Sequence, residues 1–162
     1  MLDGKTVLVT GASKGIGQSI ARELGQQGAR VIAHYGRDRA GAEAALEGLP
    51  PDRAILLQGD LAAPDGADQL FAEAIQVSGG LDGVVNNAAV MRFDGGIDDP
   101  DDAWDSVWEE TFQVNVHSAS RLLRATVRHF RERGGGEIVG ISSWAAQKGV
   151  TNPRTIAYAA SK

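Results

Sequence analysis

Short apolar runs alternate along the chain with longer segments in which apolar residues recur at helical spacing. The short runs are Thr6–Val9, Arg30–Tyr35, 54–57, 81–85 and 137–142. Continuous apolar runs of this length are typical of strands that are buried on both faces of a parallel sheet. We therefore expect five parallel strands, with Thr6–Val9 in the middle of the sheet.

Helical periodicity fills the segments between these runs. Apolar residues from Ile16 onward predict a first helix, with Gly28 as its C-cap glycine, and further helices are expected over 40–46 and 65–77. Strands joined by helices of about ten residues or more form right-handed βαβ units. The pattern predicts a doubly wound α/β fold of three layers, with the sheet between helices, as one domain over residues 1–162.

The second half of the chain predicts two more helical runs. Asp99 is the expected N-cap and Pro100 the first turn of a helix that reaches Phe112. Helical spacing then resumes from Val116 to about Arg131 and stops at three consecutive glycines. Trp104 and Trp108 lie four residues apart, which indicates a packing face of the helix.

Composition narrows the classes of chemistry. The chain has 162 residues, a net charge of −5 and 43% hydrophobic residues, which is the composition of a globular protein. It also contains 21 glycines, more than an ordinary domain of this length has. The absence of cysteine excludes disulfides, thiolate metal sites and thiol nucleophiles. No histidine spacing indicates a metal site, so we expect none.

The net charge and the N-terminal sequence indicate which binding partners and which cellular compartment to expect. A net-acidic chain with mixed signs disfavours nucleic acid as a partner, and no apolar run is long enough to cross a membrane. The start, Met1-Leu2-Asp3-Gly4-Lys5, lacks the basic region of a signal peptide. We therefore expect a cytoplasmic protein with no membrane partner.

A glycine-rich turn, Thr10-Gly-Ala-Ser-Lys-Gly-Ile-Gly17, lies between the first strand and the first helix. Such a turn directs backbone N–H groups and the positive end of a helix toward a phosphate. Gly11 allows the sharp turn, Gly15 allows close approach to a diphosphate, and Gly17 allows close packing of helix on sheet. The spacing differs from G-x-G-x-x-G and from the P-loop. The alternative is a strand–helix turn that binds no ligand.

With this turn the chain resembles the short-chain dehydrogenases/reductases, a Rossmann-like family. Its other motifs follow in order: Asp60-Leu61, Asn86-Asn87-Ala88-Ala89, Asn115, Ser142-Ser143 and Tyr158-Ala-Ala-Ser-Lys162. Ala89 stands where the family has glycine, which leaves the local backbone geometry open. The resemblance spans the entire chain. Within the family, the chain is similar to 3-oxoacyl-thioester reductases, and sugars and steroid-like compounds are also open as substrates.

The resemblance implies a site for a nicotinamide dinucleotide. The residues that it assigns to cofactor binding are Gly11, Ser13, Lys14, Gly15, Ile16, Gly17, Tyr35, Arg37, Asp60, Leu61, Asn87, Ala88, Tyr158 and Lys162. Residue Asp60 corresponds to the family's contact with the adenine.

The resemblance also implies catalytic roles for Asn115, Ser143, Tyr158 and Lys162. Hydride transfer to a carbonyl needs a proton donor for the oxygen, and a cation near a tyrosine favours its phenolate form. In the family the tyrosine is the acid/base, the lysine assists it and holds the nicotinamide ribose, the second serine orients the carbonyl, and the asparagine holds a water. Taken alone, the two serines would more often end a strand, and Tyr158 with Lys162 would more often be a surface pair, while Asn115 fits a helix cap about equally well.

The second strand bears on the choice of cofactor. An acid at its end would bind the ribose hydroxyls of NAD, whereas here Tyr35 is followed by Gly36 and Arg37, and Lys14 lies in the glycine turn. Two cations favour the 2′-phosphate, so we expect NADP rather than NAD. The alternative makes Arg37 and Asp38 an ordinary surface turn.

The sequence ends at Lys162, the last residue of the Tyr-x-x-x-Lys motif. The resemblance therefore implies a fold truncated after its fifth strand and the start of the next helix. We expect an NADP(H)-dependent oxidoreductase acting on a carbonyl or secondary alcohol and, as a full-length protein, forming a homo-oligomer. The alternatives are a non-catalytic dinucleotide-binding fragment or interaction module and, with a poorer match in glycine spacing, a nucleotide-sugar epimerase or dehydratase.

Overall fold

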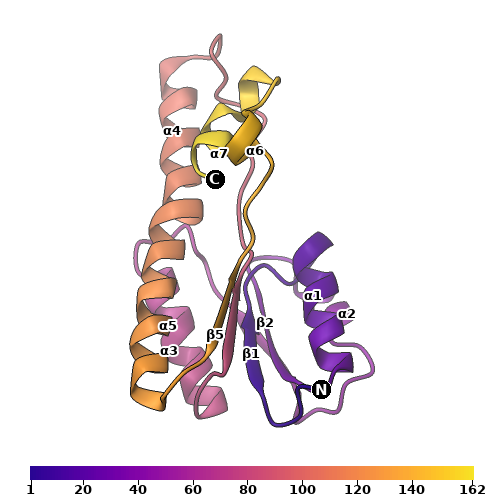
Figure 1. Ribbon diagram of the computed structural model, residues 1–162. Helices are drawn as coiled ribbons and strands as arrows, with labels where there is room; N and C mark the ends of the chain where they lie inside the picture. The colour runs from indigo at the N-terminus through magenta and orange to yellow at the C-terminus, as the bar shows by residue number, and fades with distance from the viewer.

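The computed structural model describes residues 1–162 and contains one parallel sheet with helices on both faces (Figure 1). The strand order is β3-β2-β1-β4-β5, and every neighbouring pair is parallel. The strands are β1 (Thr6–Val9), β2 (Arg30–Tyr35), β3 (Ala54–Gln58), β4 (Gly83–Asn86) and β5 (Glu137–Gly140). The expected doubly wound, three-layer architecture with β1 at its centre is confirmed.

Helices cover the sheet in two layers. Helices α1 (Gly15–Gln26) and α2 (Arg39–Ala45) lie on one face, and α3 (Gly66–Ser78) and α5 (Ala119–Arg133) lie on the other (Figure 1). The remaining segments are α4 (Asp101–Phe112), the π-helix η1 (Gln113–Ser118), α6 (Ala145–Lys148), the short 3₁₀ turn η2 (Pro153–Thr155) and α7 (Ile156–Ala160). None of these helices is long and apolar enough to cross a membrane.

Alternating side chains of the central strands form two cores. Leu8 lies opposite Ile32 and Val84 in the register, and all three pack against α3 and α5. Val9 and Val85, one position along, point to the other face and pack against α1 and α2. Burial on both faces explains why these strands are apolar along their whole length.

Strand β5 departs from this pattern. All four of its residues are exposed, as expected of a sheet that ends after its fifth strand and leaves this edge open. The reason is its place at the edge of the sheet, where it pairs only with β4. Ile138 and Val139 consequently present apolar side chains at the surface of this part of the sheet.

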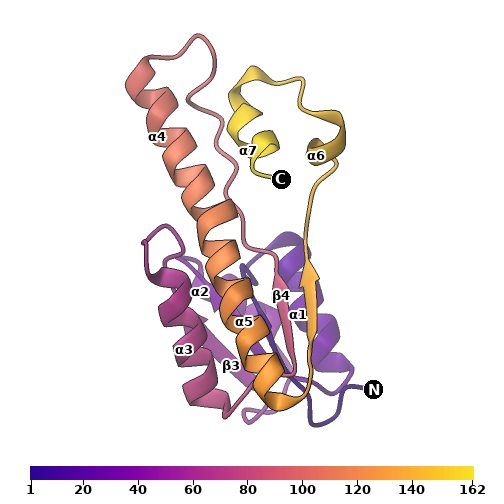
Figure 2. The same ribbon diagram turned by 60° about the vertical axis from the view of Figure 1, so that its left-hand side comes forward.

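The helical run from α4 to α5 is continuous. The sequence predicts an interruption between Phe112 and Val116, and the structure has the π-helix η1 there instead, with Asn115 in its middle. A π-turn accommodates an extra residue without breaking the helix, and such turns are frequent at functional sites. The long helix runs from above the sheet down along its face (Figure 2).

The predicted start of α4 is wrong by one position. Pro100 is the N-cap residue, with extended backbone, and the helix begins at Asp101. The Asp99 carboxylate accepts a hydrogen bond from the backbone N–H of Gly96 at 2.7 Å, so it closes the preceding loop instead of capping the helix. The expectation of a glycine at the end of α1 agrees with the structure: Gly28 directly follows the C-cap residue Gln27 and has a positive φ of 100°.

Candidate active site

The carboxyl ends of the parallel strands meet at one edge of the sheet, and the loops that follow them carry most of the expected site residues. The turn after β1 holds Gly11 to Gly17, and the loops after β3 and β4 hold Asp60 and Asn87. In an open α/β sheet this edge is where ligands bind. Helices α6 and α7 stand above the same edge, beyond the end of β5 (Figure 2).

The glycine turn is closely packed where Gly17 meets Asn87 and Gly11, and it is open at Gly15. A Cβ on Gly17 would lie 2.3 Å from both Asn87 Nδ2 and the Gly11 oxygen, so no larger residue fits there. Gly11 and Gly15 adopt positive φ angles of 66° and 58°, and a Cβ on Gly15 would meet only open space. Lys14, Gly15 and Ile16 are exposed. This open backbone at the start of a 12-residue helix fits a diphosphate group.

Asn87 supports the turn from beneath. Its Nδ2 donates hydrogen bonds to the backbone oxygens of Thr10 (2.8 Å) and Gly11 (3.1 Å). The buried Thr10 hydroxyl oxygen in turn accepts from the backbone N–H groups of Asn87 and Ala88, each at 3.0 Å. The loop after β4 therefore fixes the turn after β1. Ala89 has no positive φ, so alanine is unstrained where the family has glycine.

A residue that the sequence analysis did not select, His34, supports the same turn from the other side. It is 3% exposed, and its Nδ1 accepts a hydrogen bond from the Gly11 N–H at 3.1 Å. Its Nε2 lies 3.2 Å from the backbone oxygen of Gly59. Burial lowers the pKa of His34 below its ordinary value, against a smaller opposing effect of the bond to Gly59. The one feature of the sequence that could have indicated this role of His34 is the presence of a histidine inside an apolar strand.

The residues expected at the adenosine end differ in exposure. Lys14 and Arg37 are exposed and form no ion pair, whereas the Tyr35 side chain is buried. The carboxylate of Asp38 accepts from the backbone N–H of Gly41 at 2.9 Å and so caps α2. The acid nearest to Arg37 in the sequence is therefore engaged by the backbone, and the two free cations dominate the charge of these loops.

The loop after β3 is braced by π-helix residues. Asp60 is exposed, and its carboxylate accepts from the N–H of Ala62 at 2.9 Å. Leu61 is buried, and its backbone oxygen accepts from the Ser118 hydroxyl at 2.7 Å. Asp60 is thus available at the surface beside the turn, while the Leu61 side chain faces the core.

Asn115 connects three parts of the site. Its Oδ1 accepts from the backbone N–H of Val90 at 2.8 Å, and its Nδ2 donates to the Val90 oxygen at 3.0 Å and to the Ser161 hydroxyl at 2.8 Å. Its side chain thereby joins the π-helix, the loop after β4 and the end of α7. Ser161, which the sequence analysis passed over although it precedes Lys162 in the motif, supplies the last of these contacts.

Lys162 lies just beyond α7 and close to Tyr158. Its Nζ is 5.6 Å from the centroid of the Tyr158 ring and donates to the backbone oxygen of Ile141 at 3.2 Å. Burial lowers the pKa of this ammonium group. The short helix thus places the cation on the same side as the ring, as the four-residue spacing predicts.

Ser143 and Tyr158 line one cavity of about 310 Å³. The Ser143 oxygen accepts from the backbone N–H of Ala145 at 3.2 Å, which leaves its own proton free to donate. Ser142 instead donates to the backbone oxygen of Lys162 at 3.4 Å and does not line the cavity. The geometry favours Ser143 over Ser142, as the family pattern does.

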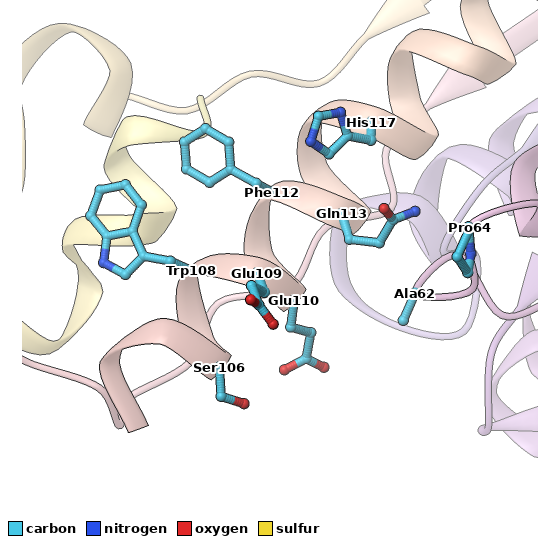
Figure 3. Close-up of a pocket in the computed structure, with 9 residues that line it drawn as sticks. All are labelled: Ala62, Pro64, Ser106, Trp108, Glu109, Glu110, Phe112, Gln113 and His117. Atoms are coloured by element: carbon cyan, nitrogen blue, oxygen red, sulfur yellow. The ribbon is translucent and has the colours of Figure 1, made fainter. Parts of the chain in front are cut away.

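A larger hollow of about 820 Å³ lies elsewhere, along α4 and η1 (Figure 3). Its lining includes Glu109, Glu110 and His117 and none of the four expected catalytic residues. Trp108 packs against Trp104 and Phe112 with ring centroids 5.3 and 5.5 Å apart. These rings are a packing face of the helix, as the sequence indicates.

Comparison with known proteins agrees with this arrangement. The family model described as short chain dehydrogenase matches residues 5–162. Versicolorin reductase of Emericella nidulans is 39% identical, covering 99% of this chain and 59% of that protein. L-rhamnose 1-dehydrogenase (NAD(P)(+)) of a Sphingomonas species is 40% identical, covering 92% of this chain and 58% of that protein.

Solved structures give the same result. A short chain dehydrogenase from Burkholderia cenocepacia in complex with NADP superposes with a TM-score of 0.83 at 35% identity, covering 99% of this chain and 64% of that one. The chain spans about three fifths of the length of the curated relatives it matches. Because the family model and these relatives extend over nearly all of its residues, the chain belongs to the short-chain dehydrogenase family.

Proposed function

We propose that this chain forms the cofactor-binding and catalytic part of an NADP(H)-dependent oxidoreductase that interconverts a carbonyl and a secondary alcohol. The observation that carries the proposal is the meeting of Ser143 and Tyr158 in one cavity, with the Lys162 ammonium beside the tyrosine ring. We further propose that residues 1–162 act as a single dinucleotide-binding domain.

The site fits a dinucleotide on the geometry of its own residues. The open backbone of Ser13 to Gly17 would hold the diphosphate, the Asp60 carboxylate the adenine, and Lys162 the nicotinamide ribose. Lys14 and Arg37 are the free cations beside this path and would bind a 2′-phosphate with charge-assisted hydrogen bonds. The structure of a relative in complex with NADP supports this choice of cofactor.

Proton transfer is assigned to the chain's own groups. Tyr158 gives its hydroxyl proton to the substrate oxygen, and the ammonium of Lys162 stabilises the phenolate that remains. The free proton of Ser143 donates to the same oxygen and orients the carbonyl. A nicotinamide cofactor held by these residues would supply the hydride for the carbonyl carbon.

Replacing Tyr158 by phenylalanine in the full-length protein tests the proposal. The variant should still bind NADPH, because only a hydroxyl is removed, and its kcat for carbonyl reduction should fall by about 10²-fold or more. Ser143→Ala should also lower kcat, and the neighbouring Ser142→Ala, which removes only a long hydrogen bond to the Lys162 backbone, should lower it much less. NADPH binding without turnover by the unaltered protein would favour a non-catalytic dinucleotide-binding module.

We also propose that the full-length protein is a homo-oligomer that uses α4 and α5. The exposed charged side chains of α4 are acidic and those of α5 are mostly basic; they include Asp101, Asp105, Glu109, Arg124, Arg128 and Arg131. Two copies packed with these helices antiparallel would bring acids opposite arginines. Sedimentation at rising salt tests this, since such a contact should weaken as salt screens the charges.

A further inference from the structure

The cavity that holds Ser143 and Tyr158 carries information about the substrate. It is formed by the loop after β4, the segment around α6 and the start of η2 and α7. Its lining contains no charged side chain: Met91, Phe93, Ser143, Trp144, Ala145, Val150, Thr151, Asn152, Thr155 and Tyr158. The lining itself therefore offers a ligand no counter-ion.

One wall of the cavity is apolar and open to solvent. Met91, Phe93 and Trp144 are 46%, 56% and 66% exposed, and all three line the same space. Large apolar side chains exposed together mark a binding surface rather than a chance distribution. Trp144 directly follows Ser143, so its indole borders the position that the substrate carbonyl would take.

Some polar groups of the lining are hydrogen-bonded within the chain. The side-chain oxygen of Asn152 accepts from the backbone N–H of Arg154, and the Thr155 hydroxyl donates to the Asn152 backbone oxygen, each at 3.0 Å. Arg92, which lies between Met91 and Phe93 in the sequence, is paired with Asp94 and Glu110. The hydroxyl protons of Ser143, Thr151 and Tyr158 and the Nδ2 group of Asn152 have no partner within the chain.

We propose that the substrate is an uncharged ketone, or the matching secondary alcohol, whose reacting carbon bears a ring or a comparable flat apolar group. The ring packs against Phe93 and Trp144 while the oxygen meets Ser143 and Tyr158. This inference rests on the proposed function, because it takes that pair of hydroxyls as the reacting end of the cavity. It separates the chain from its relative named as an L-rhamnose dehydrogenase, because L-rhamnose offers no flat apolar face to Phe93 and Trp144.

A charged substrate group would be disfavoured on the same grounds. A carboxylate or phosphate placed against Phe93 and Trp144 is partly desolvated by their apolar faces and gains no ion pair from the cavity lining. The three probes that separate these cases are acetophenone, 4-acetylbenzoate and L-rhamnose. Acetophenone and 4-acetylbenzoate share the ketone and the ring and differ in one carboxylate, so their comparison isolates charge.

The first experiment measures kcat/KM for the three probes with the full-length protein and NADPH or NADP⁺. Acetophenone should exceed 4-acetylbenzoate by about tenfold or more, and L-rhamnose should be turned over least. Equal rates for the neutral and charged ketones, or a preference for L-rhamnose, would overturn the inference while leaving the oxidoreductase function intact.

The second experiment measures binding without turnover, by saturation-transfer NMR of acetophenone with the NADP⁺ complex. Transfer to the ring protons should be strong, and Trp144→Ser and Phe93→Ser should each reduce it severalfold. Ile97→Ser is the matched control, because Ile97 is as exposed as Trp144, at 66%, and does not line the cavity. Ring contact without turnover would refute the proposed function alone; turnover of other ketones with no ring contact would refute this inference alone.

Discussion

The backbone N–H of Gly11 donates a hydrogen bond to Nδ1 of His34 at 3.1 Å. Because a backbone N–H can only donate, Nδ1 is the acceptor and the ring proton is on Nε2, which donates to the Gly59 oxygen at 3.2 Å. One neutral imidazole thus joins the cofactor turn after β1 to the end of β3. Protonation of Nδ1 would remove the acceptor and break this connection.

Because His34 forms these bonds as a neutral ring, the stability of the fold should depend on pH. Burial lowers the pKa of His34, so between that lowered value and the ordinary value of about 6.5 the unfolded chain binds a proton that the folded chain does not. The free energy of unfolding should therefore receive its full contribution from His34 above about pH 6.5 and lose it as pH falls through the folded-state pKa. Urea denaturation between about pH 5 and pH 8 measures this.

His34→Asn is the control for that experiment, because an amide can both accept and donate but does not titrate. The difference in the free energy of unfolding between His34→Asn and the unaltered protein should become smaller as pH falls. His34→Ala should weaken NADPH binding by roughly 1–3 kcal/mol, from the loss of two hydrogen bonds that hold the turn. An affinity for NADPH that is the same in His34→Ala would show that the histidine supports only the core.

The glycines of the turn should respond differently to alanine. Gly17→Ala places a Cβ against Asn87 and Gly11, so it should lower both the free energy of unfolding, by roughly 1–3 kcal/mol, and the affinity for NADPH. Gly15→Ala meets no atoms but strains a positive φ, so it should cost roughly 1–2 kcal/mol of stability. Its added methyl should also weaken NADPH binding by blocking approach of the diphosphate.

Gly48→Ala is the matched control for these variants. Gly48 has a φ of 81° and a Cβ there would meet nothing, so the strain resembles that at Gly15, but the residue lies after α2 and outside the turn. Its affinity for NADPH, measured by fluorescence titration, should not change. A loss of affinity in Gly48→Ala equal to that in Gly15→Ala would mean that strain alone accounts for both.

The sheet could be predicted because its strands are buried on both faces. Leu8, Ile32 and Val84 pack on one side and their neighbours on the other, so each strand is apolar throughout and visible as a run. Strand β5 gave the same pattern, yet it is exposed, because the position of a strand in the sheet depends on long-range pairing that a local run does not encode.

The site was predictable only in part, for a related reason. The motif residues could be located by spacing, but several partners that hold them are backbone groups with no sequence pattern, as Gly11 is for Asn87 and Val90 for Asn115. The π-helix was similarly hidden. Helical spacing persists on both sides of Asn115, so one extra residue in a turn appears in the sequence as an interruption rather than as a continuous helix.

Cofactor preference should depend on the two unpaired cations. Replacing Lys14 and Arg37 by glutamine should weaken NADPH binding by roughly 1–3 kcal/mol for each lost contact and leave NADH binding nearly unchanged. Arg39→Gln is the control, since Arg39 is equally exposed but already paired with Glu43 at 2.8 Å. Parallel losses for NADPH and NADH, read from their dissociation constants, would contradict the assignment of a 2′-phosphate site.

The contact between Asn115 and Ser161 should determine how firmly the Tyr158–Lys162 segment is held. Ser161→Ala removes the one hydrogen bond from the π-helix to α7 and the bond from the Ser161 hydroxyl to the Tyr158 oxygen. Asn115→Ala removes the first of these and both bonds to Val90. At roughly 0.5–1.5 kcal/mol per bond, Asn115→Ala should be the more destabilising change. In the full-length protein, Ser161→Ala should lower kcat with little change in the affinity for NADPH, because the glycine turn keeps its own supports. If kcat is unchanged while stability falls, the contact contributes to folding and not to the position of the catalytic pair.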